Sequence, residues 1–223
     1  MAIAFDTDSD GTQNSSNTLT FSHTCTGEGL VLIVSVGWWE NPDAARTVSG
    51  VTYNGVSMTS AVSQTTGTPD TARGTEIFYL AIPAIGANDV VVTMSSTTDA
   101  IQGNAASFTG CDVDDPIGDT TAGTALSIVV DTDRDNSFVV DNVQNLDANC
   151  ASISLTVGAS QTQMANQCAN SGTGASRQAV SREATTTKGA VTMSWSGTAD
   201  NPIHCGVEVH EGVVGVQGGV MIF

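Results

Sequence analysis

The chain has 223 residues, of which 40% are hydrophobic, so it can form one large or two small domains with a buried core. Its 23 acidic and 6 basic residues give a net charge of -17, which excludes a basic footprint for nucleic acid and disfavours anionic membrane surfaces. The 23 glycines are typical of short strands joined by tight turns, and long runs of helix-forming residues are missing.

The beginning of the chain carries no targeting pattern. Residues 1–17 are rich in Asp, Asn and Ser after a short apolar start, and they predict an N-terminal arm or loop. A basic segment followed by an apolar one is absent there, and no run of about 18 apolar residues occurs anywhere. We therefore expect neither a signal peptide nor a transmembrane helix.

The first strands are indicated by their hydrophobic patterns. Thr18–Thr24 alternates as a half-buried strand does, whereas the near-continuous apolar run Leu30–Trp38 predicts a central strand covered on both faces. Asn54-Gly55 lies within Val51–Met58 and predicts a hairpin with a type I′ turn, because both central residues of that turn need a positive φ.

The remaining patterns complete an all-β prediction. Polar loops are expected at Gln64–Gly74 and Asn166–Gly174. Further strands are expected at Thr75–Ile82, Asp89–Met94, Ile101–Phe108, Ala125–Val130, Ser137–Val143, Ala151–Val157, Ala175–Arg182, Ala190–Trp195 and Ile203–His210. Strands spaced by roughly 8–12 residues are typical of sandwiches and barrels, so we predict a single antiparallel, jelly-roll-like β-sandwich over residues 18–211.

Residues 212–223 form an apolar C-terminal tail. Exposed apolar segments are costly in water, which leaves two interpretations. The tail packs on its own domain, or it docks into a neighbouring subunit through its last residues, Val220, Met221, Ile222 and Phe223.

The five cysteines are Cys25, Cys111, Cys150, Cys168 and Cys205, and none has the spacing of a zinc site. Cys150 and Cys168 lie symmetrically about Ala159. A hairpin around Gly158-Ala159 would place their thiols opposite each other, so they are the candidate disulfide. The alternative is a pair of small, half-buried side chains.

Two acidic segments offer alternating carboxylates, the ligands that Ca²⁺ prefers. Asp6, Asp8 and Asp10 precede Gly11 as in the first half of a calcium loop, but Asn17 stands where the bidentate Glu is expected. A second set and a third acidic cluster complete the candidates: Asp131, Asp133 and Asp135, and Asp112, Asp114 and Asp115. Acidic turns also serve solubility, so bound calcium and a merely solvated surface both remain open.

Candidates for catalysis are few. His204 adjoins Cys205, but neighbours on a strand point to opposite faces and cannot form a dyad. Glu208 shares a strand face with His204 and with His210, a pattern that more often gives a hydrogen bond than a site. No nucleophile elbow, phosphate loop or dinucleotide fingerprint is present, so we expect no enzyme activity and no cofactor.

The Trp38-Trp39 pair follows the central strand at the edge of a loop. Alternation predicts that one ring enters the core and that the other is a contact residue. Aromatic rings stack on sugars, which makes a host-surface glycan a candidate partner.

Several segments, taken in order, resemble a widespread, poorly characterised β-sandwich family of bacterial surface proteins and phage particle proteins. They are Leu30–Trp38, Val51–Met58, Glu76–Pro83, Ser107–Gly110 with Asp115–Ile117, Ser137–Asp141, and Val191–Trp195 followed by His204–Val209. The likeness covers residues 18–211 and consists of packing and turn motifs. It implies a β-sandwich and no catalytic residues, and the cysteines and the apolar tail depart from it.

These observations predict a non-enzymatic structural protein of a virus particle, most simply a phage capsid decoration or fibre-type subunit. Its partners would be other virion subunits or further copies of itself, and it would reach the exterior by cell lysis. The second prediction is a carbohydrate-binding or adhesive surface module.

Overall fold

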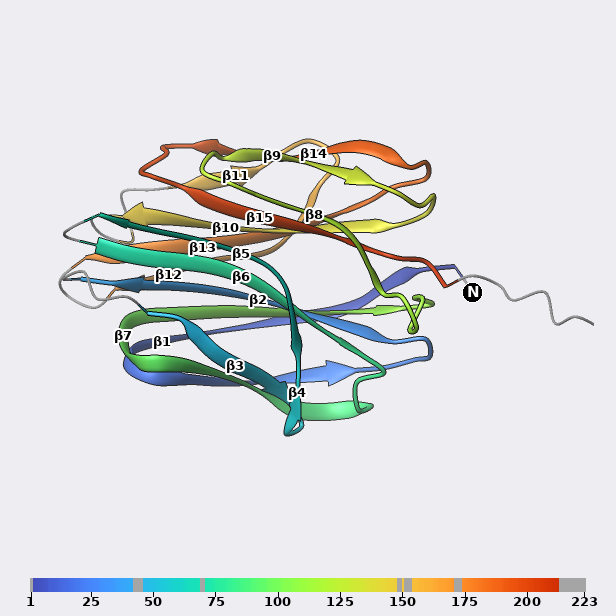
Figure 1. Cartoon of the computed structure of the whole chain (residues 1–223), viewed down its shortest axis with the longest axis horizontal. Helices are drawn as coiled ribbons and strands as arrows, with labels where there is room; N and C mark the ends of the chain where they lie inside the picture. The colour runs from blue at the N-terminus through green and yellow to red at the C-terminus, as the bar shows by residue number, and fades with distance from the viewer. Residues whose placement is uncertain are drawn as a thin grey trace, which may run out of the picture.

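The protein is described by a computed structural model, which covers residues 2–41, 46–68, 71–147, 150, 154–170 and 174–212. Within these residues all regular elements are β-strands, and all strand pairs are antiparallel (Figure 1). None of these residues belongs to a helix long and apolar enough to cross a membrane. The all-β prediction is therefore confirmed.

The strands of the described residues form three sheets. The seven-stranded sheet contains β1 (Ala4–Cys25), β2 (Val31–Glu40), β3 (Val48–Tyr53), β4 (Val56–Ser57), β5 (Thr59–Thr68), β6 (Thr71–Ala81) and β7 (Gly86–Thr109). The five-stranded sheet contains β8 (Ile117–Gly123), β10 (Phe138–Asp147), β12 (Thr162–Asn170), β13 (Ala175–Ala184) and β15 (Ile203–Val209). The three-stranded sheet contains β9 (Ser127–Thr132), β11 (Leu155–Val157) and β14 (Gly189–Gly197).

The first sheet folds back on itself along a long ribbon of β1 and β7. Their register runs from Ala4↔Thr109 to Cys25↔Gly86, with a shift between Ser16 and Thr18. On its other edge β7 pairs first with β3 and then with β2, so its two halves belong to two layers of the same sheet. This sheet is nearly closed around a core of its own.

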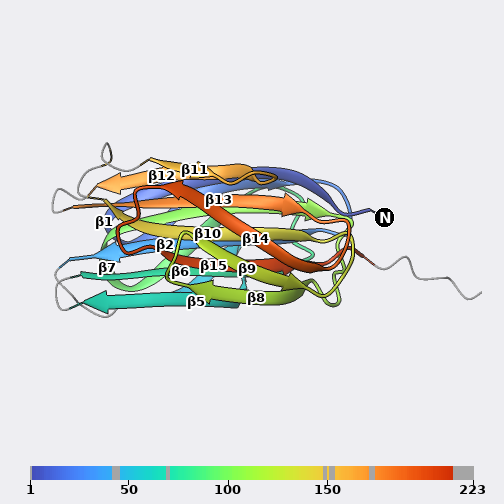
Figure 2. The ribbon, with the colours of Figure 1, turned by 90° about the horizontal axis from the view of Figure 1, so that it is seen from above.

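The sheets stack as layers, with the three-stranded sheet at the top of Figure 1 and the folded sheet at the bottom. Seen from above, the strands run along the long axis of the molecule (Figure 2). Strand β2 explains how the layers connect, because all of its residues are buried. Leu32 and Val34 face the core inside the folded sheet, whereas Val31 and Ile33 face the five-stranded sheet. The prediction of a strand covered on both faces is confirmed.

The opposite face of the five-stranded sheet carries the third layer. Val139 of β10 packs on Met193 of β14 in one cluster, and Val143 packs on Trp195 in another. The prediction of a single jelly-roll sandwich is therefore wrong. Folding the first sheet on itself and adding a third sheet produces more layers than one sandwich has.

Three polar segments form strands where loops were expected. Residues 4–17 are the first part of β1 and not an arm, because they pair along β7. Strands β5 and β6 pair from Thr59↔Tyr79 to Thr68↔Thr71, so they cover most of the predicted loop Gln64–Gly74. The predicted loop Asn166–Gly174 begins within β12. Strands β1, β5 and β12 lie at sheet edges, where backbone pairing needs no apolar side chains, so their polar segments show no hydrophobic pattern.

The Asn54-Gly55 hairpin forms as predicted. Strands β3 and β4 pair as Tyr53↔Val56, and the residues between them have φ values of 49° and 75°. Both values are positive, as a type I′ turn requires. By contrast, Asp89–Met94 and Ile101–Phe108 are not separate strands but the two halves of β7.

Candidate functional site

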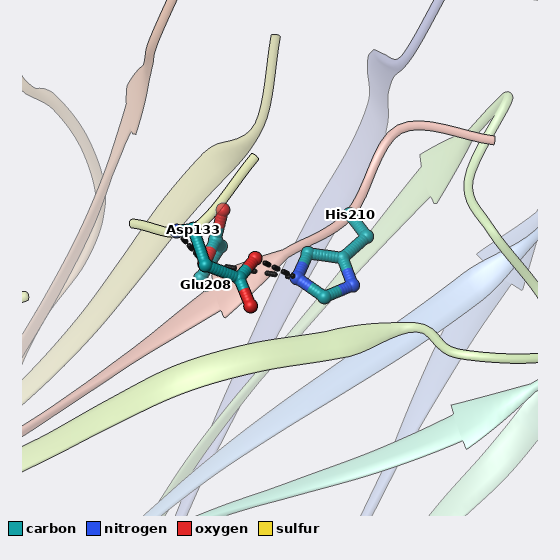
Figure 3. A group of neighbouring side chains, drawn as sticks. All are labelled: Asp133, Glu208 and His210. Atoms are coloured by element: carbon teal, nitrogen blue, oxygen red, sulfur yellow. Dashed lines mark hydrogen bonds and ion pairs between the residues drawn. The ribbon is translucent and has the colours of Figure 1, made fainter. Parts of the chain in front are cut away.

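Three side chains that can hold a metal ion converge where β15 ends: Asp133, Glu208 and His210. Glu208 belongs to β15, His210 follows that strand directly, and Asp133 begins the loop between β9 and β10. Both carboxyl groups point toward the same edge of the imidazole ring (Figure 3). The potential ligand atoms all lie within 4.8 Å of one another.

Glu208 is an unusual carboxylate because its side chain has no solvent exposure. Its Oε2 accepts the backbone N–H groups of Asp133 (3.0 Å) and Asp119 (3.3 Å). Its Oε1 accepts the backbone N–H of Arg134 (3.2 Å) and the hydroxyl of Ser137 (2.6 Å). A buried carboxyl group is tolerated when hydrogen-bond donors surround it, and four donors surround this one.

His210 is held by acceptors on both sides of its ring. Nδ1 lies 2.8 Å from the backbone oxygen of Asp115, and a carbonyl oxygen only accepts, so Nδ1 carries a hydrogen. Nε2 lies 3.1 Å from Oδ1 of Asp133 and 3.6 Å from Oε2 of Glu208. The ring therefore presents Nε2 to two carboxyl groups.

Gly118 packs closely against these atoms, and any side chain at this position would collide with them. A Cβ at this position would lie 2.2 Å from Nε2 of His210 and 2.3 Å from Oε2 of Glu208. Strand β8 also has an irregular register here, because Val207 pairs with Thr120 but Val209 pairs with Ile117. Such a bulge changes the direction of the strand and often accompanies a functional site.

An ion pair fixes the loop on the other side of His210. Arg134 donates to Asp112 (2.7 Å) and also pairs with Asp115. The hydrogen bond from Arg134 lowers the pKa of Asp112, and the same bond raises the pKa of Arg134. The predicted acidic cluster of Asp112, Asp114 and Asp115 is thus a turn in which Asp112 accepts the backbone N–H groups of the other two.

A second histidine–carboxylate pair is completely buried in the layer below the three-stranded sheet. His204 and Asp141 both have fully buried side chains, and Nε2 of His204 lies 2.9 Å from Oδ2 of Asp141. The same oxygen accepts the indole N–H of Trp195 (2.8 Å), while Oδ1 accepts two bonds from Ser181. His204 thus bonds to Asp141 and not to Glu208, and its neighbour Cys205 lies in the core on the other face, as predicted.

The third histidine, His23, lies in a chain of hydroxyl groups between the two halves of the bent ribbon. Its Nδ1 is 2.9 Å from Oγ of Ser9, and its Nε2 is 3.1 Å from Oγ of Ser107, which donates to Asp6. Burial lowers the pKa of His23 to about 4, against an ordinary value of 6.5, so the ring is neutral near pH 7.

The first predicted calcium loop is not formed. Asp6, Asp8 and Asp10 lie on β1, in extended backbone that spaces Asp8 and Asp10 by about 7 Å, and Asp6 lies in an irregularity of the register where it bonds to Thr26 and Ser107. Burial opposes ionisation of Asp6, but bonds from Thr26 and Ser107 outweigh it and lower the pKa of this carboxyl. Burial raises the pKa of Asp8.

The second predicted calcium set is divided between different partners. Asp131 is exposed on β9, and Asp135 accepts the backbone N–H of Lys188. Only Asp133 joins the cluster with Glu208 and His210. The sequence contained part of this signal, since Glu208 and His210 share a strand face. The contribution of Asp133 depends on the fold.

The predicted tryptophan platform is wrong. Trp38 is 3% exposed and Trp39 is 2% exposed, so neither ring offers a face to a sugar. Trp39 instead packs with Ala100 and Ala169, and its ring lies against Gly174, where a Cβ would come within 2.9 Å.

The predicted disulfide is confirmed. Cys150 and Cys168 are bonded, with their Cα atoms 5.6 Å apart. The proposed hairpin between them is not formed, because β11 pairs with β14 and β12 pairs with β13. The other cysteines, Cys25, Cys111 and Cys205, are free and buried, and burial raises the pKa of the last two to about 12.

An apolar pocket lies at the end of the molecule where β1 turns into β2. Its volume is about 320 Å³, and Leu30, Ile82, Pro83, Ile85 and Val113 supply its apolar lining. Ile82 is 72% exposed and Ile85 is 69% exposed. Tail residues Val220, Met221, Ile222 and Phe223, which were predicted to dock, lie outside the described residues.

No protein-family model matches the chain, and no curated protein matches it in sequence.

Proposed function

We propose that this protein is a non-enzymatic structural subunit that associates with copies of itself on the surface of a virus particle, as a capsid decoration or fibre-type protein. The observation that carries the proposal is the pair of exposed isoleucines, Ile82 and Ile85, at the rim of the apolar pocket. Large apolar side chains at such exposure, next to an apolar hollow, are characteristic of an interaction surface.

The backbone at Ile82 supports this interpretation. Its φ is 54°, a left-handed conformation that β-branched residues rarely adopt and that costs about 1–3 kcal/mol. Its N–H donates to the carbonyl of Leu30 at 2.9 Å, which holds the turn in place. A strained turn that exposes an isoleucine does not stabilise the single chain, whereas an exposed isoleucine can make an apolar contact with another subunit.

The occupant that we propose for the pocket is the apolar segment after Gly212, supplied by a second copy of the chain. Gly212 donates to the carbonyl of Gly110 (2.8 Å), and Gly110 and Cys111 donate to Glu28 and Gly29. Glu28 and Gly29 line the pocket, so this segment begins close to it. Residues 213–223 carry no charge and seven large apolar side chains, which suit an apolar hollow.

The chemistry of the rest of the molecule agrees with this mode of association. Copies with a net charge of -17 repel one another, so association needs apolar contacts that outweigh the repulsion. The disulfide suits an oxidising exterior. The virus-particle part of the proposal draws on the resemblance of residues 18–211 to phage particle proteins.

Light scattering coupled to gel filtration tests the proposal on the full chain. We expect an oligomer for the wild type and monomers for Ile82→Asn and for a chain ending at Gly212. Val129→Asn is the matched control, because Val129 is also exposed (44%) but lies on β9, outside the pocket. A monomeric wild type, or an oligomer that both variants retain, would contradict the proposal.

A further inference from the structure

We propose that Asp133, Glu208 and His210 bind one divalent transition-metal ion of the zinc type at the end of β15. The site is independent of the proposed self-association, because none of its residues lines the apolar pocket. The two carboxylates and the imidazole come from the β9–β10 loop, from β15 and from the residue just beyond it, so a bound ion would join these segments.

The spacing of the ligand atoms fits such an ion. Zinc lies about 2.0–2.2 Å from nitrogen and oxygen ligands, so two ligands of a tetrahedral ion are separated by about 3.3–3.6 Å. Nε2 of His210 lies 3.1 Å from Oδ1 of Asp133 and 3.6 Å from Oε2 of Glu208. Both separations are close to those expected around the metal, and the potential ligand atoms all lie within 4.8 Å of one another.

The orientation of the imidazole is also that of a metal ligand. Ligating histidines donate their second ring N–H to a carbonyl or carboxylate, which fixes the tautomer and directs the other nitrogen at the metal. Nδ1 of His210 donates to the carbonyl of Asp115, so the lone pair of the neutral ring lies on Nε2. Gly118 keeps that side of Nε2 and Oε2 clear of a side chain.

The donor set suits a divalent ion. Two carboxyl groups and an imidazole offer the oxygen and nitrogen ligands that such an ion binds. The mixed nitrogen and oxygen donors favour zinc over Ca²⁺, which takes oxygen ligands. Glu208 and His210 are 0% and 2% exposed, whereas Asp133 is 58% exposed, so the loop side provides the path of entry.

The competing occupant is a proton. In that case His210 is an imidazolium that donates to Asp133 at 3.1 Å, and no metal is needed. The two alternatives make different predictions, because only the metal site responds to zinc in solution at constant pH.

Calorimetric titration of zinc into the full chain, freed of metal with a chelator, distinguishes them. We expect one equivalent of zinc per chain, a visible absorption band when cobalt replaces it, and no binding of calcium. Asp133→Asn should weaken zinc at least about tenfold, since removal of even an outer partner of a ligand costs that much. Its side chain is exposed, so this variant is expected to fold.

Asp131→Asn and Asp135→Asn are the matched controls. They remove charge from the same acidic segment, yet Asp131 is exposed on β9 and Asp135 bonds to the backbone of Lys188. Both should bind zinc as the wild type does. Absence of zinc binding, with the ring ¹⁵N resonances of His210 unchanged by zinc, would assign the site to the proton. Equal binding by Asp133→Asn and the wild type would also overturn the proposal.

Discussion

Asp141→Asn is expected to destabilise the protein strongly, because Asp141 is the acceptor on which a buried network depends. Its Oδ1 accepts two bonds of 2.7 Å from Ser181, and its Oδ2 lies 2.8 Å from the indole nitrogen of Trp195 and 2.9 Å from Nε2 of His204. An asparagine replaces one of these oxygens by an N–H₂ group. In either orientation of the amide, that group meets donors where the carboxylate offered an acceptor.

The magnitude follows from the burial of the network. Asp141 and His204 have fully buried side chains, so water cannot replace the lost acceptor. A buried donor that loses its acceptor costs about 1–3 kcal/mol, a large part of the typical stability of a domain. Urea unfolding followed by circular dichroism measures this loss. Asp131→Asn, an exposed position, should change the stability by less than about 0.5 kcal/mol. A loss below about 1 kcal/mol for Asp141→Asn would show that the stability does not depend on this buried acceptor.

Four further predictions concern the disulfide, the thiols, His23 and Ile82. Replacing Cys150 and Cys168 by serine should lower the free energy of unfolding, measured in urea, by about 3 kcal/mol, since the disulfide joins residues with a sequence separation of 18. At pH 8 the three free, buried thiols should not react with iodoacetamide in the native protein, but they should react once the protein is unfolded without reductant. Mass spectrometry detects the labelled thiols, and labelling of the native protein would contradict their burial. The unfolded histidine takes up a proton near pH 6.5, whereas His23 in the folded protein does so only near pH 4. The stability that depends on neutral His23 is therefore fully present above pH 6.5 and falls by about 3 kcal/mol as the pH drops to 4. The difference in unfolding free energy between the wild type and His23→Gln should show the same pH dependence. A flat difference would show that His23 is not held neutral. Ile82→Asn should raise the unfolding free energy of the monomer by about 1 kcal/mol, because asparagine tolerates the positive φ of 54°, and unchanged stability would argue against strain at this turn.

The parts of the fold that could be predicted are those with a local physical signature. The apolar run of β2 indicated burial on both faces, and all of its residues are buried. Asn54-Gly55 indicated a type I′ hairpin because few other residue pairs adopt two positive φ values in succession. Neither signature depends on distant parts of the chain.

The parts that could not be predicted are set by pairing between distant segments. Residues 4–17 are polar, yet they form a strand because β7 supplies backbone partners about a hundred residues further on, as in Ala4↔Thr109. The bend of the β1–β7 ribbon turns one sheet into two layers, and the polar run Ser95–Asp99 at this bend indicated a loop between two strands instead. The number of layers could therefore not be predicted from the sequence.

The candidate site shows the same division. Glu208 and His210 lie two residues apart on one strand face, so their proximity could be seen in the sequence. Asp133 reaches Nε2 of His210 across 77 residues of sequence, and only the pairing of β9 and β10 with their neighbours brings it there. The same reasoning placed Cys150 and Cys168 together correctly while assigning them to the wrong hairpin, since the strands between them pair elsewhere.

We propose that copies of this chain associate through the pocket beside Ile82 and Ile85. A photo-reactive amino acid introduced at position 85 reports this contact, in an equal mixture of ¹⁴N-labelled and ¹⁵N-labelled protein. We predict cross-links between residue 85 of one copy and residues 213–223 of another, seen as peptide pairs of mixed isotope. Cross-links confined to single-isotope pairs, or the absence of any link to residues 213–223, would contradict the claim.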